Sequence, residues 1–138
     1  MTLMNIKQES ILEFPLENKT VLLIDDESRL RQIVAMMLEE LGGKVISVDN
    51  GEEAVSVYKT KQSQIDLILL DLCMTGMDGK EVYRIIKNIN KNIKIALSSG
   101  LLPEQSFLDL LKNDGAIFIE KPFDMDKLSS EIFQLMYN

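Results

Sequence analysis

The sequence predicts an α/β fold in which a parallel β-sheet is covered by helices on both faces. Short, continuous apolar runs alternate five times with segments whose apolar residues recur at helical spacing. Continuous apolar runs indicate strands buried on both faces, and their alternation with helices is typical of a parallel sheet. The length of 138 residues fits one domain around one core.

The strands are expected at the apolar runs that follow residue 18. The stretch before them, residues 1–18, has no strong pattern and is expected to be an N-terminal extension or linker. A short helix is expected over Ile6–Phe14, with Pro15 ending it. The folded domain is expected over residues 19–138. Its strands are expected at Val21–Ile24, Val45–Val48, Leu67–Leu70, Ile93–Leu97 and Ala116–Ile119.

A helix is expected after each strand. Asp25 to Ser28 resemble a helix start, and Gly42–Gly43 stops the first helix. Its inward stripe is expected to be Leu30, Ile33, Val34, Met37, Leu38 and Leu41, with Met36 off the stripe and exposed. The second helix follows a turn at Asn50–Gly51, and its apolar face is Ala54, Val55 and Tyr58.

The last three helices follow the same pattern. The third is marked by Val82, Ile85, Ile86 and Ile89. Pro103 is expected to open the fourth, which carries Phe107, Leu108 and Leu111. The step Lys121–Pro122 leads into the fifth, whose inward residues are Leu128, Ile132, Leu135 and Met136.

The composition excludes several classes of function. The chain has no histidine, so it holds no histidine metal site, Ser-His triad or phosphohistidine of its own. One cysteine, Cys73, excludes an internal disulfide and fits a reducing cytoplasm. A net charge of −7 argues against direct nucleic-acid binding. No apolar run approaches the roughly 18 residues of a membrane span, so no membrane contact is expected.

Polar side chains gather where the expected strands end. In open sheets of this kind, the functional crevice lies at the carboxyl ends of the strands. The residues placed there are Asp25 and Asp26, Asp71, Ser98 and Ser99, and Lys121. Three neighbouring carboxylates repel one another, so this crevice suits a hard cation such as Mg2+. A carboxylate beside such a cation is a competent nucleophile toward phosphorus, and a lysine neutralises phosphoryl oxygens.

Four segments carry a family resemblance. VLLIDDE, LILLDLCMTGMDG, IALSSG and GAIFIEKPF resemble, in order and spacing, the motifs of the response-regulator receiver family of two-component systems. The resemblance covers residues 19–138. It implies a doubly wound, flavodoxin-like (βα)5 fold with the strand order 2-1-3-4-5.

The resemblance also implies the role of each site residue. Asp71 would be the phosphoacceptor. The Mg2+ ligands would be Asp26, Asp71 and the backbone carbonyl of Cys73, with Asp25 acting through water. Ser99 and Phe118 would be the switch residues, and Lys121 would pair with the phosphate. The Lys121–Pro122 peptide is expected to be cis.

The implied function is that of a phosphorelay receiver in the cytoplasm. The phosphodonor would be a sensor histidine kinase or a histidine phosphotransfer protein. A downstream protein would read the face formed by the fourth helix, the fifth strand and the fifth helix. The chain would be a single-domain regulator or the receiver of a larger protein, such as a hybrid kinase. It is not expected to be an enzyme beyond self-catalysed phosphotransfer and slow autodephosphorylation.

The sequence departs from the family pattern in the loop after Asp71. Thr75 stands where relatives usually have proline, and is expected to loosen that loop. Cys73 and Leu101 occupy positions through which the family tunes the lifetime of the phosphorylated state.

Three other functions compete with this interpretation. Residues 71–75 approach the D-x-D-x-T motif of haloacid-dehalogenase-type phosphatases, but Cys73 stands where that chemistry needs a second Asp. A flavin module on the same fold needs a phosphate loop where Asp25, Asp26 and Glu27 stand. A degenerate receiver that acts as a phosphorylation-independent interaction module is the third alternative.

Overall fold

A single parallel sheet forms the centre of the molecule. The computed structural model describes residues 10–138. The sheet has five strands in the order β2-β1-β3-β4-β5, as the family resemblance implies, and every neighbouring pair is parallel. The strands are β1 (Thr20–Ile24), β2 (Lys44–Val48), β3 (Leu67–Asp71), β4 (Lys94–Ser99) and β5 (Ile117–Glu120).

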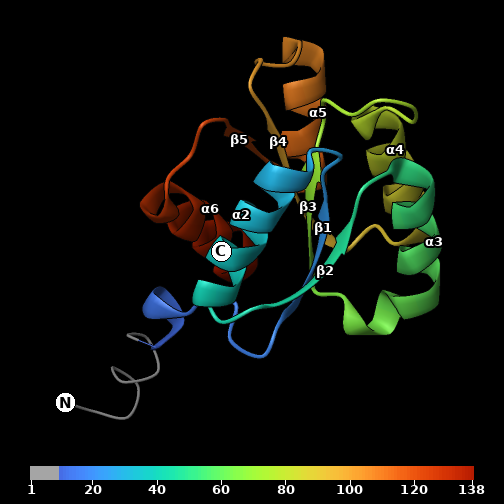
Figure 1. The fold of residues 1–138 in the computed structure, drawn as a ribbon. Helices are drawn as coiled ribbons and strands as arrows, with labels where there is room; N and C mark the ends of the chain where they lie inside the picture. Colours follow the sequence, from blue (N-terminus) through green and yellow to red (C-terminus); the bar gives the residue numbers. More distant parts are fainter. Residues whose placement is uncertain (1–9) are drawn as a thin grey trace.

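Helices cover both faces of the sheet (Figure 1). Two of them, α2 (Ser28–Glu40) and α6 (Met125–Tyr137), pack on one face. The other face carries α3 (Gly51–Lys61), α4 (Gly79–Ile89) and α5 (Gln105–Asp114). A short 3-10 helix, η1 (Gln62–Gln64), follows α3. The fold is therefore doubly wound and flavodoxin-like, with two hydrophobic layers separated by the sheet.

Successive side chains along each strand point to opposite faces of the sheet and so contribute to both hydrophobic layers. Val21 and Leu23 of β1 pack with α2 and α6, whereas Leu22 and Ile24 pack with the helices of the other face. All five residues of β3 are buried. This double burial explains why the strands are continuous apolar runs.

Local signals set several helix ends. Asn50 is the N-cap of α3, and its side chain accepts a hydrogen bond of 2.8 Å from the backbone N–H of Glu53. Asp78 and Asp124 cap α4 and α6 in the same way. Gly115 ends α5 at a φ of 76°, a conformation that favours glycine.

The structure corrects two expectations about helices and tests a third in part. Ile33 does not lie on the inward stripe of α2, because its side chain is 55% exposed. The fourth helix begins at Gln105 and not at Pro103, since Glu104 has an extended backbone. Of the expected helix Ile6–Phe14, residues 10–13 are helical and the part before residue 10 lies outside the described residues.

The segment that precedes β1 packs against the domain. Leu16 is fully buried in the layer of α2 and α6, and its N–H bonds the carbonyl of Leu41 at 3.0 Å. The hydroxyl of Tyr137 donates to the carbonyl of Pro15 at 2.8 Å. Within residues 10–138, no helix has the length and apolar character that crossing a membrane requires.

Candidate functional site

The polar side chains at the carboxyl edge of the sheet converge as the sequence predicts. Tyrosines apart, the buried polar or charged residues of the described chain are four, and all lie at this edge. They are Asp25, Asp71, Ser98 and Ser99. Asp26 lies beside them, half-buried. Three strands, β1, β3 and β4, deliver this set because parallel strands end at the same edge.

Three carboxylates form the centre of the site. Asp25, Asp26 and Asp71 each offer an oxygen, and these oxygens lie within 4.8 Å of one another. A backbone N–H holds one oxygen of each carboxylate. Glu27 N donates to Asp25 Oδ1 at 2.9 Å, and Cys73 N donates to Asp71 Oδ1 at 3.0 Å. The cluster is therefore oriented by its own backbone.

Lys121 supplies the positive charge at the site. Its Nζ lies 3.5 Å from Asp25 Oδ2 and 3.6 Å from Asp71 Oδ2. The ammonium thus faces the oxygens of these two residues that the backbone does not hold. The Lys121–Pro122 peptide bond is cis, in agreement with the expectation.

Burial dominates the electrostatics of Asp71. Removal of the carboxylate from water raises its pKa above the usual 3.8, and the nearby charges of Asp25 and Asp26 raise it further. The N–H of Cys73 and the ammonium of Lys121 act in the opposite direction but do not outweigh burial. The ionised site therefore has a deficit of positive charge.

The donor set fits a hard divalent cation. The ligands on offer are carboxylate oxygens, and the backbone holds them at a separation that one ion can bridge. Mg2+ and similar ions prefer such oxygens and keep several waters. The chemistry of these residues thus supports a metal site at Asp25, Asp26 and Asp71.

Thr75 contacts the carboxylate of Asp26, a member of the three-carboxylate cluster. Its N–H and its hydroxyl both donate to Asp26 Oδ2, at 2.9 and 3.1 Å. This finding differs from the expectation that Thr75 loosens the loop after Asp71. Proline has neither donor, so threonine here adds two tethers between the loop and the site.

Ser99 is held by two contacts at the end of β4. Its Oγ accepts a hydrogen bond from Leu101 N at 3.1 Å and lies 3.1 Å from Cys73 Sγ. Ser98 points elsewhere, since its hydroxyl donates to the carbonyl of Ile119 at 2.8 Å. Ser99 is therefore the hydroxyl adjacent to the loop of Asp71, while Ser98 joins β4 to β5.

Phe118, the other residue with an expected switch role, lies away from the carboxylates. It is half-buried on β5 beside Leu97 and packs against the layer of α3, α4 and α5. It also lines a groove between α5, β5 and α6. The switch role of Phe118 and the ligand role of the Cys73 carbonyl stay predictions.

One residue of the site region escaped the sequence analysis. Gly79 begins α4 against the backbone that follows Asp71, so a Cβ at this position would lie 2.6 Å from Leu72 Cα and 2.8 Å from Asp71 O. The only sequence signal is a glycine directly after the N-cap Asp78. This close approach fixes the start of α4 against the loop that follows Asp71.

A comparison with known families decides the assignment. The family described as the response regulator receiver domain matches residues 21–133. The chain belongs to this family. The receiver domain accordingly spans most of the chain, and the elements of the site come from within the matched residues.

Curated relatives include both single-domain and multidomain proteins. The receiver domain is 35% identical over 114 residues to the autoinducer 1 sensor kinase/phosphatase LuxN of Vibrio campbellii, covering 81% of this chain and 13% of LuxN. It is 29% identical over 113 residues to the chemotaxis protein CheY of Bacillus subtilis, covering 81% of this chain and 92% of CheY. It is also 29% identical to sporulation initiation phosphotransferase F of the same species, over 83% of this chain and 91% of the relative.

Solved structures share the fold. A CheX–CheY–BeF3–Mg2+ complex from Borrelia burgdorferi contains a chain that superimposes with a TM-score of 0.80 at 28% identity, covering 87% of this chain and 90% of that one. The receiver domain of the hybrid histidine kinase CckA matches with a TM-score of 0.71 at 25% identity, covering 85% and 98%.

Proposed function

We propose that this receiver domain accepts a phosphoryl group on Asp71 from a phosphohistidine of another protein and uses the modification as a signal. One observation carries the proposal. The buried Asp71 lies 3.6 Å from Lys121 and within a cluster of three carboxylates that suits a cation. The family match supports the same function.

The proposed transfer exchanges one bond to phosphorus for another. A carboxylate oxygen of Asp71 forms a bond to the phosphorus, while the phosphorus–nitrogen bond of the donor breaks. The imidazole leaves with the electron pair and takes a proton from water. The chain's own lack of histidine is no obstacle, because phosphoryl transfer depends on positioning and charge neutralisation.

The surrounding residues would neutralise and orient the group. Mg2+, held by Asp26, Asp71, the carbonyl of Cys73 and, through water, Asp25, would supply positive charge to the phosphoryl oxygens. Lys121 would keep its place beside Asp71 and pair with one of those oxygens. The Cys73 N–H would continue to orient the acceptor carboxylate.

The signal would pass through Ser99. Its hydroxyl would leave Cys73 and donate to the phosphoryl group, which carries about −1.5 to −2 charges. The end of β4 would follow, and Phe118 would turn inward. The surface that changes would then be the groove between α5, β5 and α6, where a downstream protein would bind.

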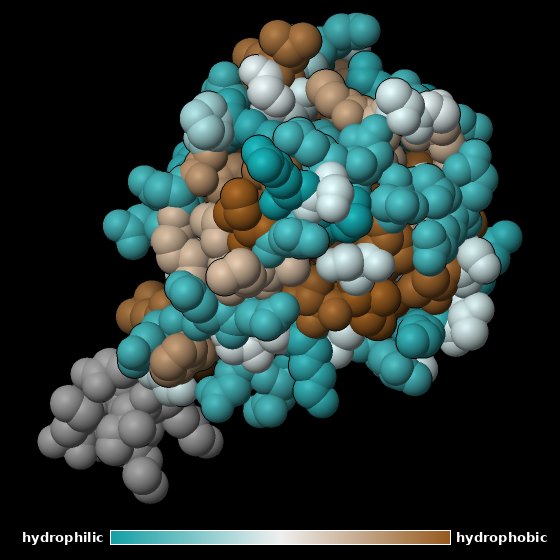
Figure 2. Space-filling view, viewed as in Figure 1, coloured by the Kyte–Doolittle hydropathy of each residue, from teal (hydrophilic) through white to brown (hydrophobic). Residues whose placement is uncertain are grey.

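The donor would dock beside the acceptor on an apolar surface. A groove of about 450 Å³ between α2 and the β5–α6 loop is lined by Leu30, Ile33, Met37, Pro122 and Phe123, among others. Lys121, which lies 3.6 Å from Asp71, also lines this groove, so a donor bound there would lie beside the acceptor. Figure 2 shows hydrophobic residues at the surface over α2 and α6. Relatives named as a sensor kinase and as a phosphotransferase support this partner class.

Intact-mass measurement tests the function. The domain is incubated with Mg2+ and acetyl phosphate, in parallel with Asp71→Asn. We expect the wild type alone to gain one phosphoryl group, and chelation of Mg2+ to abolish the gain. A gain in both proteins would place the acceptor elsewhere, and no gain in either would remove the proposal.

The alternative is an interaction module that is never phosphorylated. It is not favoured, because acceptor, lysine and switch hydroxyl are all present at the site.

We also propose that the domain turns over no substrate of its own, because Cys73 cannot serve as the acid and base of a phosphatase. The exposed thiol of Cys73 supports a location in the reducing cytoplasm.

A further inference from the structure

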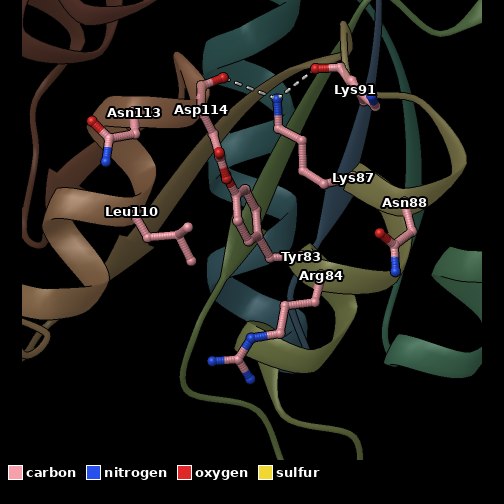
Figure 3. A pocket seen from close by; sticks show the side chains of 8 residues that line it. All are labelled: Tyr83, Arg84, Lys87, Asn88, Lys91, Leu110, Asn113 and Asp114. Carbon is pink, nitrogen blue, oxygen red and sulfur yellow. Dashed lines mark hydrogen bonds between the residues drawn. The ribbon is translucent and has the colours of Figure 1, made fainter.

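Another groove lies between α4 and α5, at the C-terminal ends of both helices. Its volume is about 580 Å³. Arg84, Lys87 and Lys91 line one side, and Leu110, Asn113 and Asp114 of α5 line the other (Figure 3). We call this surface the basic groove. None of its residues belongs to the carboxylate cluster at the edge of the sheet.

Positive charge is concentrated here against the trend of the chain. Lys80, Arg84 and Lys87 recur at helical spacing along one side of α4, and Lys91 follows in the turn after the helix, which ends at Ile89. Between Gly79 and Lys94 the only acidic residue is Glu81, although the chain as a whole carries a net charge of −7. A local reversal of sign on an acidic domain marks a surface suited to an anionic partner.

The one carboxylate in the groove is already engaged. The hydroxyl of Tyr83 donates to Asp114 Oδ2 at 2.6 Å, which joins α4 to α5. Tyr83 is buried and its ring packs edge-on against Phe107 at 5.9 Å. This pair therefore fixes the distance between the two walls, and the hydrogen bond spreads the negative charge of Asp114.

Lys87 fixes the floor of the groove. Its Nζ donates to three backbone carbonyls, those of Lys91 at 3.2 Å, Ile93 at 3.0 Å and Asp114 at 3.3 Å. Figure 3 shows Lys87 reaching from α4 toward Asp114, beside the ring of Tyr83. Three donors meet three acceptors, so this ammonium is committed to the fold and stays in one place.

Arg84 and Lys91 remain available to a ligand. Both side chains are exposed, and neither makes a hydrogen bond or an ion pair with any residue in 10–138. They lie at opposite ends of the view in Figure 3. Between them Leu110 is 37% exposed on the facing wall, and Asn113 adds an amide.

We propose that the basic groove binds an acidic polypeptide segment of a partner protein. The two available cations, Arg84 and Lys91, stand at opposite ends of the groove (Figure 3), which suits spaced carboxylates better than one phosphate group. Leu110 offers an apolar contact that a peptide side chain can meet. The acidic charge of the remaining surface opposes a long polyanion that would extend beyond the groove.

This binding is separate from the phosphoryl chemistry. The groove lies at the opposite end of α4 from the acceptor loop, and it needs neither a metal ion nor phosphorylation. It can therefore fail while the proposed function holds, and the reverse is also true.

The test uses a labelled peptide and paired charge reversals. The probe is a fluorescein-labelled helical peptide of about 16 residues, with glutamates spaced like the basic side chains and one leucine. Its anisotropy is measured with the unphosphorylated domain at low ionic strength. The groove variant carries Arg84→Glu and Lys91→Glu. The control variant carries Lys59→Glu and Lys61→Glu on the exposed side of α3, which changes the net charge by the same amount.

We expect the wild type to bind the peptide and the groove variant to bind it about tenfold more weakly, whereas the control loses less than about twofold. A version of the peptide with glutamine for glutamate should not bind. Equal losses in both variants would reduce the effect to diffuse attraction and overturn the proposal, as would an absence of binding to the wild type. Tighter binding of a single-stranded oligonucleotide, lost in the groove variant, would replace the polypeptide with a nucleic acid.

Discussion

Thr75 gives this receiver domain a contact that the proline usual in the family cannot make. Both of its donors act on Asp26 Oδ2, which leaves the other oxygen of that carboxylate to face a cation. A carboxylate that is already oriented loses less entropy on binding an ion. Thr75 would thus act on the proposed metal site through Asp26.

Removal of the Thr75 hydroxyl should weaken metal binding. We expect Thr75→Val to raise the Kd for Mg2+ about threefold, because an exposed hydrogen bond contributes about 0.5–1 kcal/mol. Thr75→Ser keeps both donors and should bind like the wild type, and Thr75→Pro, which loses both, should bind more weakly than Thr75→Val. The affinity is measured by NMR titration of the unphosphorylated domain. Tighter binding by Thr75→Val would mean that the hydroxyl competes with the ion.

The burial of Asp71 should make the stability of the fold depend on pH. Because the pKa of Asp71 is raised above 3.8 in the folded chain, the folded state holds its proton more tightly than the unfolded state does. The protonated Asp71 carboxyl contributes fully to the free energy of unfolding below pH 3.8, and this contribution is lost as the pH rises through the raised pKa.

Asp71→Asn should therefore stabilise the metal-free domain at neutral pH. We expect its Tm at pH 7 to exceed that of the wild type by a few degrees, and the difference to shrink as the pH falls toward 4. Thermal unfolding followed by circular dichroism at several pH values measures this. A variant less stable than the wild type at pH 7 would show that the attraction of Lys121 outweighs burial.

At the level of elements, the junction between β3 and α4 depends on one glycine. Gly79→Ala places a Cβ against the backbone of Leu72, which cannot move without moving the loop that follows Asp71. We expect a loss of about 1–3 kcal/mol in unfolding free energy, measured by urea denaturation, and slower phosphorylation by acetyl phosphate. Gly100→Ala is the control, since a Cβ added there would meet no atom within 4 Å. Equal stability of the two variants would contradict the close approach.

The elements themselves could be predicted from periodicity. Every strand lies within two residues of its expected position, because strands buried on both faces leave an unambiguous apolar run. The burial of individual helix residues was less predictable. Ile33 fits the apolar stripe of α2 but lines an open groove beside Pro122, since the stripe is wider than the surface that covers it.

The predicted site residues converge for a similar reason. Parallel order alone brings Asp25, Asp71 and Lys121 to one edge. The contact of Thr75 with Asp26 was not predictable, because the two residues are 49 positions apart and the loop path decides whether they meet. The basic groove was not predicted from the sequence for another reason. The net charge of −7 sums over all residues, so it does not reveal a local excess of positive charge.

At the level of the whole molecule, the core extends beyond the matched family region. Leu16 lies before β1 and is fully buried among the residues of α2 and α6. We expect Leu16→Ala to lower the unfolding free energy by about 2–5 kcal/mol. Leu12→Ala, four residues earlier at an exposed position, should change it by less than about 0.5 kcal/mol. Chemical denaturation of both variants checks this. A small effect of Leu16→Ala would mean that the segment before β1 is a loosely attached linker.

The hydrogen bond between Tyr137 and Pro15 brings the first and last parts of the fold to one place. A chain that enters and leaves a domain at the same point can be spliced into another protein between neighbouring positions of a surface loop. The two ends of the host loop would not have to move apart to accommodate such an insert. Because residues 15 and 137 lie close together, the domain is suited to insertion into a loop of a reporter protein as well as to fusion at its end.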